Sequence, residues 1–271
     1  MTAIRHDGQR DGGGRAPDRR PTIVFLHGTR LTGASWAAQV AALGDAFHCL
    51  APDLLGHGRS EGGPFTLDGA ADFVVELIAR EAHGGRAILV GQSLGGYVAM
   101  AAAARAPERI SGLVLAGATA EPVGLRSLPY LGLAVIFGRM PNALLDRVNA
   151  RYFRWRYPAA IADPIIAAGF SFGGGAVAIR ALVGQRFKPR LAAYSGPTLL
   201  ISGEFDFFFR PTGRSFAAVA ANVERVVVRR ATHLANLDQP ARFSSLIRDF
   251  AERSGTVRRV GDHRHDQSGD S

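Results

Sequence analysis

Short, continuous runs of apolar residues recur along the chain and alternate with segments of helical periodicity. The apolar runs are short enough to be strands buried on both faces, and in the first half of the chain they cover residues 22–26, 47–51, 86–90 and 110–116. The helical segments between and after them cover residues 36–43, 66–81 and 97–105. This alternation of strand and helix predicts an α/β fold built on a parallel sheet.

The alternation stops between residues 121 and 193, where the pattern is helical without a clear strand. Helices are expected there at 128–137, 141–157, 164–170 and 176–187. Alternation then resumes with the strand 197–202, the helix 212–221, the strand 223–228 and the helix 239–252. Residues 1–20 and 255–271 are polar and lack an apolar period, so both are expected to be disordered tails.

A glycine-flanked serine lies between the apolar run 86–90 and the helix that follows it. The segment reads Gly91-Gln92-Ser93-Leu94-Gly95, and Gly-x-Ser-x-Gly between a strand and a helix is the pattern of a nucleophile elbow. Side chains at Gly91 and Gly95 are expected to collide with neighbouring backbone. Ser93 is therefore a candidate nucleophile, and the alternative is a plain tight turn.

A serine nucleophile needs a base and a carboxylate that holds the base, in the chain order serine, acid, histidine. Of the eight histidines, only His233 follows a late strand within the segments expected to be ordered; the alternative is a surface histidine. Asp206, in the loop after the strand 197–202, is the candidate acid. Glu204 in the same loop is the nearer rival, and Glu121 is a more distant one.

Acyl transfer also needs donors for the oxyanion. The backbone N–H of Leu94, the residue after the serine, is one candidate, and that of Thr29, in the loop after the strand 22–26, is the other. His27, at the start of that loop, is expected to be structural. Metal-ligand spacings are absent from the sequence, so neither a metal nor an organic cofactor is implied.

The amino-acid composition and charge limit the classes of partner that the protein is expected to bind. The net charge is +9, and residues 121–195 hold ten basic residues against three acidic ones. No nucleic-acid-binding motif accompanies this charge, so it indicates a solvated surface, an anionic substrate or a membrane surface. Cys49 is the only cysteine and the N-terminal residues lack an apolar core segment, which together fit a reducing compartment such as the cytoplasm. No apolar run approaches the roughly 18 residues of a membrane span, which leaves surface association.

Taken together, the motifs resemble the α/β-hydrolase superfamily over about residues 22–252. They are His27-Gly28, Asp53-x-x-Gly56-x-Gly58-x-Ser60, Gly91-x-Ser93-x-Gly95-Gly96, Gly203-Glu204-x-Asp206, and His233 followed by Asp238-x-Pro240. The resemblance implies a triad of Ser93, Asp206 and His233, a core formed by 21–120 and 194–254, and a helical cap at 121–193. It also implies that Asp53–Ser60 is a structural loop, with contact between His57 and substrate as the alternative.

Two departures from the family are visible. Members usually begin with a β-hairpin before the His-Gly strand, and residues 1–20 do not look like one, so about six strands, all parallel, are expected. The acid loop is unusually aromatic, because Phe205 and 207–209 surround Asp206. These rings either pack against the cap or form a wall of an apolar acyl pocket.

The resemblance implies the class of reaction. Haloalkane dehalogenases and epoxide hydrolases of the superfamily use aspartate as nucleophile, so the serine disfavours both. A small-molecule carboxylic ester, thioester or lactone is the favoured substrate, cleaved through an acyl-enzyme. The alternatives are a carbon–carbon bond hydrolase, a menaquinone-pathway-type lyase, or a hydrolase-like receptor with slow turnover. Arg154 and Arg156 of the basic cap are candidates for binding an anionic substrate. These motifs indicate neither the acyl group nor the oligomeric state.

Overall fold

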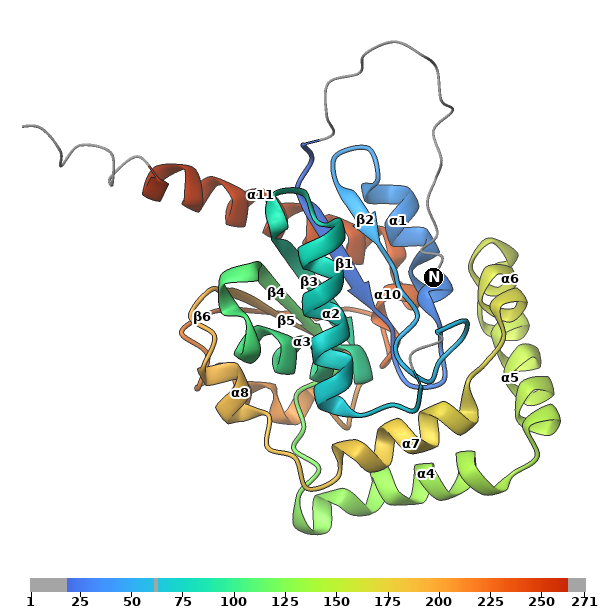
Figure 1. The fold of residues 1–271 in the computed structure, drawn as a ribbon. Helices are drawn as coiled ribbons and strands as arrows, with labels where there is room; N and C mark the ends of the chain where they lie inside the picture. The colour runs from blue at the N-terminus through green and yellow to red at the C-terminus, as the bar shows by residue number, and fades with distance from the viewer. Residues whose placement is uncertain (1–18, 61–62, 263–271) are drawn as a thin grey trace, which may run out of the picture.

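A computed structural model of the protein describes residues 19–60 and 63–262, with side chains described as far as Ser254. Six strands form one sheet in the order β2–β1–β3–β4–β5–β6 (Figure 1). The strands are β1 (Thr22–Leu26), β2 (His48–Leu50), β3 (Ala87–Gln92), β4 (Ile110–Ala116), β5 (Pro197–Gly203) and β6 (Asn222–Val228). Every neighbouring pair is parallel. The predicted α/β fold with about six parallel strands is confirmed.

Helices cover both faces of the sheet, because successive residues of a buried strand point to opposite sides. In β1, Val24 and Leu26 belong to one core and Ile23 and Phe25 to the other. The first core is covered by α2 (Leu67–Glu81) and α3 (Leu94–Arg105). The second is covered by α1 (Ala37–Leu43), which follows the 3-10 helix η1 (Gly33–Trp36), and by α11 (Pro240–Asp262).

A helical insertion, defined here as residues 124–192, joins β4 to β5 (Figure 1). It consists of η4 (Gly124–Ser127), α4 (Leu128–Arg139), α5 (Asn142–Arg156), α6 (Ala159–Ala168), α7 (Phe172–Leu182) and α8 (Lys188–Ala192). Arg30, just after β1, forms an isolated bridge with Ser171, so the insertion meets the sheet at the carboxyl ends of its strands. The helix expected at 164–170 starts earlier, at Ala159, because Pro158 precedes that helix and Pro164 lies inside it.

The remaining helices connect these layers. They are η2 (His83–Gly85), η3 (Pro107–Arg109), η5 (Arg210–Thr212), α9 (Gly213–Ala217) and α10 (Ala235–Asp238).

The ends of the chain differ in part from the predicted tails. α11 continues to Asp262, beyond the predicted helix 239–252, since each residue added to a formed helix gains a backbone hydrogen bond. At the other end Arg20 donates to the carbonyl of Gly44, so the predicted tail 1–20 ends in a residue held against the fold. Residues 1–18 and 263–271 lie outside the described residues.

Candidate active site

Ser93 makes the whole turn between β3 and α3. β3 ends at Gln92 and α3 begins at Leu94, which leaves Ser93 with φ 51° and ψ −114°. A positive φ at a residue with a side chain costs on the order of 1–3 kcal/mol and persists only where the surroundings enforce it. Part of that enforcement is a hydrogen bond of 2.8 Å from the Ser93 N–H to the carbonyl of Ala116 in β4.

The flanking glycines allow the turn to close. A Cβ at Gly91 would lie 2.4 Å from the backbone of Gly95, and a Cβ at Gly95 would lie 2.1 Å from the carbonyl oxygen of Leu26. Neither distance is tolerable for carbon, so the predicted need for glycine at both positions is confirmed.

His233 and Asp206 meet at the same edge of the sheet. His233 follows β6, Asp206 follows β5, and the His233 Nδ1 lies 2.9 Å from Asp206 Oδ2. The other carboxylate oxygen, Oδ1, accepts a 3.1 Å hydrogen bond from the Phe209 N–H. Asp206 is buried, whereas the His233 side chain is 35% exposed. The arrangement fixes the imidazole through Nδ1 and leaves Nε2 for a second partner.

The two rival acids bind elsewhere. Glu204 accepts a 2.8 Å hydrogen bond from the backbone N–H of Arg230. Glu121 accepts hydrogen bonds of 3.1 and 3.0 Å from the N–H groups of Phe187 and Lys188, where the insertion returns to the sheet. Each carboxylate therefore holds a chain connection, and Asp206 is the one that contacts the histidine.

Ser93 and His233 open into one cavity of about 320 Å³. Its wall includes the two candidate oxyanion residues, Thr29 and Leu94, and the acid Asp206. The structure therefore gathers all five site residues that were predicted from the sequence. Most of the remaining wall is apolar or aromatic, and it comprises Leu31, Tyr97, Pro129, Tyr130, Leu133, Ile179, Leu182, Phe208, Phe209 and Leu234.

The aromatic acid loop divides between the cavity and solvent. Phe208 and Phe209 line the cavity, and the Phe209 ring stacks on the His233 imidazole with centroids 4.8 Å apart. The Phe208 ring also packs against the ring of Tyr130 in α4, with centroids 5.7 Å apart. Phe205 and Phe207 are 49% and 77% exposed. Phe208 therefore has both roles suggested for the aromatic loop, since it packs against the insertion and lines the cavity. Phe207 has neither of these roles.

The two candidate oxyanion donors are backbone N–H groups of residues that line the cavity, Leu94 and Thr29. Leu94 is the first residue of α3, so its N–H has no acceptor inside the helix, and the helix N-terminus favours negative charge. The N–H of Thr29 makes no hydrogen bond with any other residue that the structure describes. Gly28 lets the Thr29 loop lie close to the end of β3, because a Cβ there would lie 2.0 Å from Gln92 Oε1 and in contact with Ser93 Cβ at 3.4 Å.

Two buried histidines, His27 and His57, hold loops. His27 Nε2 accepts a 2.9 Å hydrogen bond from the Leu54 N–H, and its Nδ1 lies 3.0 Å from the carbonyl of Gly28. Burial lowers the pKa of His27 to about 3, so the ring is neutral. His57 is buried with its Nδ1 3.0 Å from the Leu55 carbonyl, and it does not line the cavity. The structural interpretation of His27 is confirmed, and substrate contact by His57 is not supported.

Asp53 ties this loop to the start of η1. Its Oδ1 accepts from the Gly33 N–H at 2.7 Å, and its Oδ2 accepts from the Arg59 N–H at 2.9 Å. The segment from Asp53 to Ser60 is therefore the structural loop that the resemblance implied.

Two further residues hold the His233 loop, and sequence reasoning assigned neither of them a role. Gln92 Nε2 donates to the His233 carbonyl at 3.2 Å. Asp238 Oδ2 accepts from both the N–H and the hydroxyl of Thr232 at 2.6 Å. Asp238 was already part of the recognised motif Asp238-x-Pro240, and that motif was the signal for its role.

Asp238 also fixes one of the two arginines suggested for substrate binding. Its Oδ1 accepts from Arg156 at 2.6 Å and from the Tyr157 hydroxyl at 3.1 Å. Arg156 is therefore half of an ion pair that ties α5 to the His233 loop. Arg154 is exposed, and neither arginine lines the cavity, so their suggested contact with substrate is not supported.

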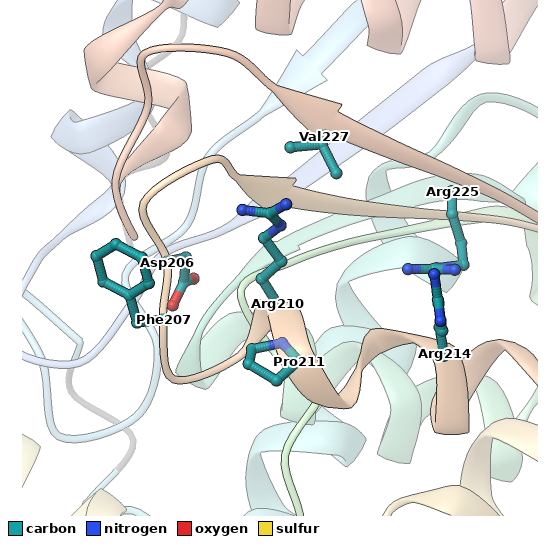
Figure 2. A pocket seen from close by; sticks show the side chains of 7 residues that line it. All are labelled: Asp206, Phe207, Arg210, Pro211, Arg214, Arg225 and Val227. Carbon is teal, nitrogen blue, oxygen red and sulfur yellow. The ribbon is translucent and has the colours of Figure 1, made fainter.

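A second hollow, of about 490 Å³, is lined by residues of the acid loop and of β6. Figure 2 shows the side chains of three arginines, Arg210, Arg214 and Arg225, among the residues that line it. Asp206 borders this hollow, but Ser93 and His233 do not line it. The candidate reacting groups therefore belong to the first cavity, which Ser93 and His233 both line. Among the described residues, no three His, Cys, Asp or Glu side chains are grouped to hold a metal ion.

Comparison with known proteins agrees with the fold. A family model described as the alpha/beta hydrolase family matches residues 23–246. A 2-hydroxymuconate semialdehyde hydrolase from a Pseudomonas species is 30% identical, with 84% of this chain and 86% of that protein aligned.

Two solved structures are also similar to this chain. A thermophilic esterase from Thermogutta terrifontis is 27% identical with a TM-score of 0.72, over 86% of this chain and 90% of that one. An enol-lactonase from Burkholderia xenovorans is 26% identical with a TM-score of 0.71, over 88% and 94%. The chain belongs to the α/β hydrolase family.

Proposed function

We propose that this member of the α/β hydrolase family hydrolyses a carboxylic ester, thioester or lactone, with Ser93 as nucleophile, His233 as base and Asp206 as the acid that orients it. The observation that carries the proposal is that Ser93 and His233 line one cavity while Asp206 Oδ2 lies 2.9 Å from His233 Nδ1. In this proposal residues 121–193 are the cap over that cavity.

The proposed reaction has two halves. Ser93 Oγ attacks the acyl carbon while its proton passes to His233 Nε2, and the N–H groups of Thr29 and Leu94 stabilise the oxyanion. The leaving alcohol, thiol or enol takes the proton from His233, which leaves an acyl-enzyme at Ser93. Water then loses a proton to His233 and attacks the acyl carbon, and collapse of that intermediate returns the proton to Ser93 and releases the acid.

The cavity wall favours a small and largely apolar substrate. Its volume of about 320 Å³ is at the lower end of the range for small-molecule sites. The aromatic side chains of Tyr97, Tyr130 and Phe208 stand beside the reacting groups, where they suit an apolar acyl or alcohol part. Similarity to a protein named as an esterase and to one named as an enol-lactonase supports an ester-type bond.

One relative keeps a second reaction in consideration. It is named a 2-hydroxymuconate semialdehyde hydrolase, and a semialdehyde acid contains no ester bond. Hydrolysis of a carbon–carbon bond next to a ketone would use the same Ser93, His233 and Asp206, with a carbon leaving group that takes the proton.

The decisive experiment measures turnover on a substrate panel by the parent and by Ser93→Ala. The panel contains p-nitrophenyl esters of graded chain length, acyl-CoA thioesters, a lactone and a vinylogous diketone. Ser93→Ala should lower kcat by on the order of 10⁴-fold, and a fluorophosphonate probe should label the parent at Ser93 but not the variant. Near-normal turnover by Ser93→Ala contradicts the mechanism. Release of a single equivalent of p-nitrophenol per chain would instead indicate a receptor with slow turnover.

A matched pair of variants tests the acid. Asp206→Asn should cost about 10⁴-fold in kcat because the amide favours the wrong histidine tautomer. Glu204→Gln, in the same loop, should cost far less, because Glu204 binds the Arg230 backbone and not the histidine. The reverse ranking would move the acid to Glu204.

A further inference from the structure

Helix α4 exposes an apolar face of a kind that soluble helices avoid. Its buried side consists of Tyr130, Ala134 and Phe137, and α4 packs on α7. Figure 1 shows α4 on the outer margin of the molecule, with α7 between it and the sheet. Its outer side exposes large apolar side chains by 39–60%, and these are Leu128, Leu131, Leu133, Val135 and Ile136.

An ordinary amphipathic helix carries polar residues on its outer side, and a helix that is apolar all round is normally covered. From Leu128 to Gly138 every exposed residue of α4 is apolar or glycine. A contiguous face of this kind marks a surface that binds something.

The next helix, α5, is basic and aromatic on its exposed side. α5 exposes Val148, Tyr152 and Trp155, with Trp155 78% exposed. The segment 124–156 holds six arginines against one aspartate, and the aspartate, Asp146, is only partly exposed. Five of the arginines are exposed and form no ion pair with a carboxylate of the described residues; they are Arg126, Arg139, Arg147, Arg151 and Arg154.

We propose that this α4–α5 face, defined by the exposed residues of Gly124–Arg156 named above, binds the surface of a bilayer that contains anionic lipid. Apolar side chains that enter the acyl region, a tryptophan at the interface and a basic margin are the features of a helix that lies on a membrane. Among the described residues no single helix is long and apolar enough to cross a bilayer, and α4 and α5 meet at a bend of 113°. The bent pair together passes that test of length and composition, but the arginines along α5 favour headgroups over the acyl core, so the pair is assigned to the bilayer surface.

The positive charge of the α4–α5 face favours an anionic bilayer over a second copy of the chain as its binding partner. A symmetric dimer through this face would bring two sets of unpaired arginines together, with Asp146 as the only acidic residue of the segment. Anionic lipid headgroups supply the opposite charge, and each arginine near such a surface raises binding by about fivefold.

The face is continuous with the cavity that holds Ser93. Pro129, Tyr130 and Leu133 of α4 line that cavity, and Leu133 is also 40% exposed on the outer face. A protein docked through α4 would hold the cavity wall at the lipid surface, where acyl-chain esters partition. This delivery of substrate rests on the proposed function, whereas bilayer binding does not.

The test is co-sedimentation of the full chain with vesicles. Parent and Ser93→Ala should both sediment with vesicles of phosphatidylcholine and phosphatidylglycerol, far less with pure phosphatidylcholine, and less as salt is added. Because Ser93→Ala keeps the face, its binding separates this proposal from the hydrolase mechanism. Failure of the parent to bind the anionic vesicles overturns the proposal.

Matched variants locate the surface. Ile136→Glu should lower binding at least tenfold, while Val227→Glu on the edge strand β6, 43% exposed against 47% for Ile136, should not. Arg147→Gln with Arg151→Gln should lower binding by about 25-fold. Arg214→Gln with Arg225→Gln removes the same charge from the hollow of Figure 2 and should have little effect.

Equal losses in both members of either pair would contradict the assignment to this face. A different outcome would identify a second copy of the chain as the occupant of this face. In that outcome the parent is a dimer that does not bind vesicles, and Ile136→Glu is monomeric.

Discussion

Gly117 offers a direct test of how tightly the fold positions His233. It follows β4, has φ +57°, and a Cβ built there would lie 2.8 Å from both Cε1 and Nδ1 of the His233 ring. The same Cβ would lie 3.2 Å from Asp206 Oδ2. Ordinary van der Waals contact begins near 3.4 Å, so in Gly117→Ala the ring must retreat by roughly 0.6 Å.

Gly117→Ala is expected to lower both the stability of the fold and the rate of catalysis, and the two effects can be estimated separately. An L-residue in the left-handed region costs about 1–2 kcal/mol of folding free energy. A displacement of about 1 Å in a catalytic group can cost on the order of 100-fold in rate, so a shift of roughly 0.6 Å should cost between about 10-fold and 100-fold in kcat. KM should change less, because the apolar wall of the cavity stays in place.

Gly124→Ala is the matched control. Gly124 has φ +56°, and no atom lies within 4 Å of a Cβ built there. It should therefore carry the same backbone strain without touching the site. The assay is kcat and KM on a p-nitrophenyl ester that the parent hydrolyses, together with urea denaturation of all three proteins.

Both variants should lose similar stability, and only Gly117→Ala should lose kcat. A Gly117→Ala enzyme with the parent's kcat would refute the argument that the backbone of Gly117 limits the position of the imidazole. An equal loss of kcat in Gly124→Ala would assign the effect to general destabilisation.

Three further predictions concern stability and reactivity. Asp238→Asn should lower kcat and destabilise the fold by about 1–3 kcal/mol in urea denaturation, because Thr232 and Arg156 lose a charged acceptor. Arg156→Gln should cost less stability, since Asp238 keeps its other donors. Burial holds the folded pKa of His27 at about 3, below its ordinary 6.5, so the unfolded chain binds a proton first and this contribution to stability is lost as pH falls below 6.5. The slope between pH 6 and 4.5 should be about 1.4 kcal/mol per unit shallower in His27→Gln, and an unchanged slope would exclude His27. Burial raises the pKa of Cys49 to about 11, so a thiol reagent at pH 8 should react slowly with the native protein and rapidly in urea; equal rates would contradict that burial.

The parts of the site that local pattern encodes could be predicted from the sequence. The strand β3, the turn at Ser93 and the helix α3 are consecutive in the chain, so periodicity and glycine positions were enough to predict them. Asp206 and His233 each follow a strand of a parallel sheet, and the carboxyl ends of such strands meet at one edge. The ends of α6 and α11 were missed because a proline and a polar composition can each suggest either the start or the end of a helix.

Contacts between distant segments could not be predicted in this way. The close approach of Gly117 to His233 depends on how the loops after β4 and β6 pack, and neither loop signals the other in sequence. The choice between Asp206 and Glu204 likewise depended on geometry, since two residues of one loop point to different partners.

The basic composition of the insertion shows why charge has to be assigned residue by residue. The count over 121–195 could not distinguish arginines that hold the fold from those that face outward. In the structure Arg156 is paired with the buried Asp238, and Arg190 lies 3.8 Å from Asp68, so both act within the fold. Arg147 and Arg151 form no ion pair among the described residues and are exposed on α5, which follows the apolar helix α4 in the chain. Five of the ten basic residues of 121–195 are therefore exposed arginines of the α4–α5 face that form no ion pair among the described residues, and they lie outside the cavity. This argues that the basic character of the insertion concerns where the protein binds, and that the apolar cavity wall concerns what it cleaves.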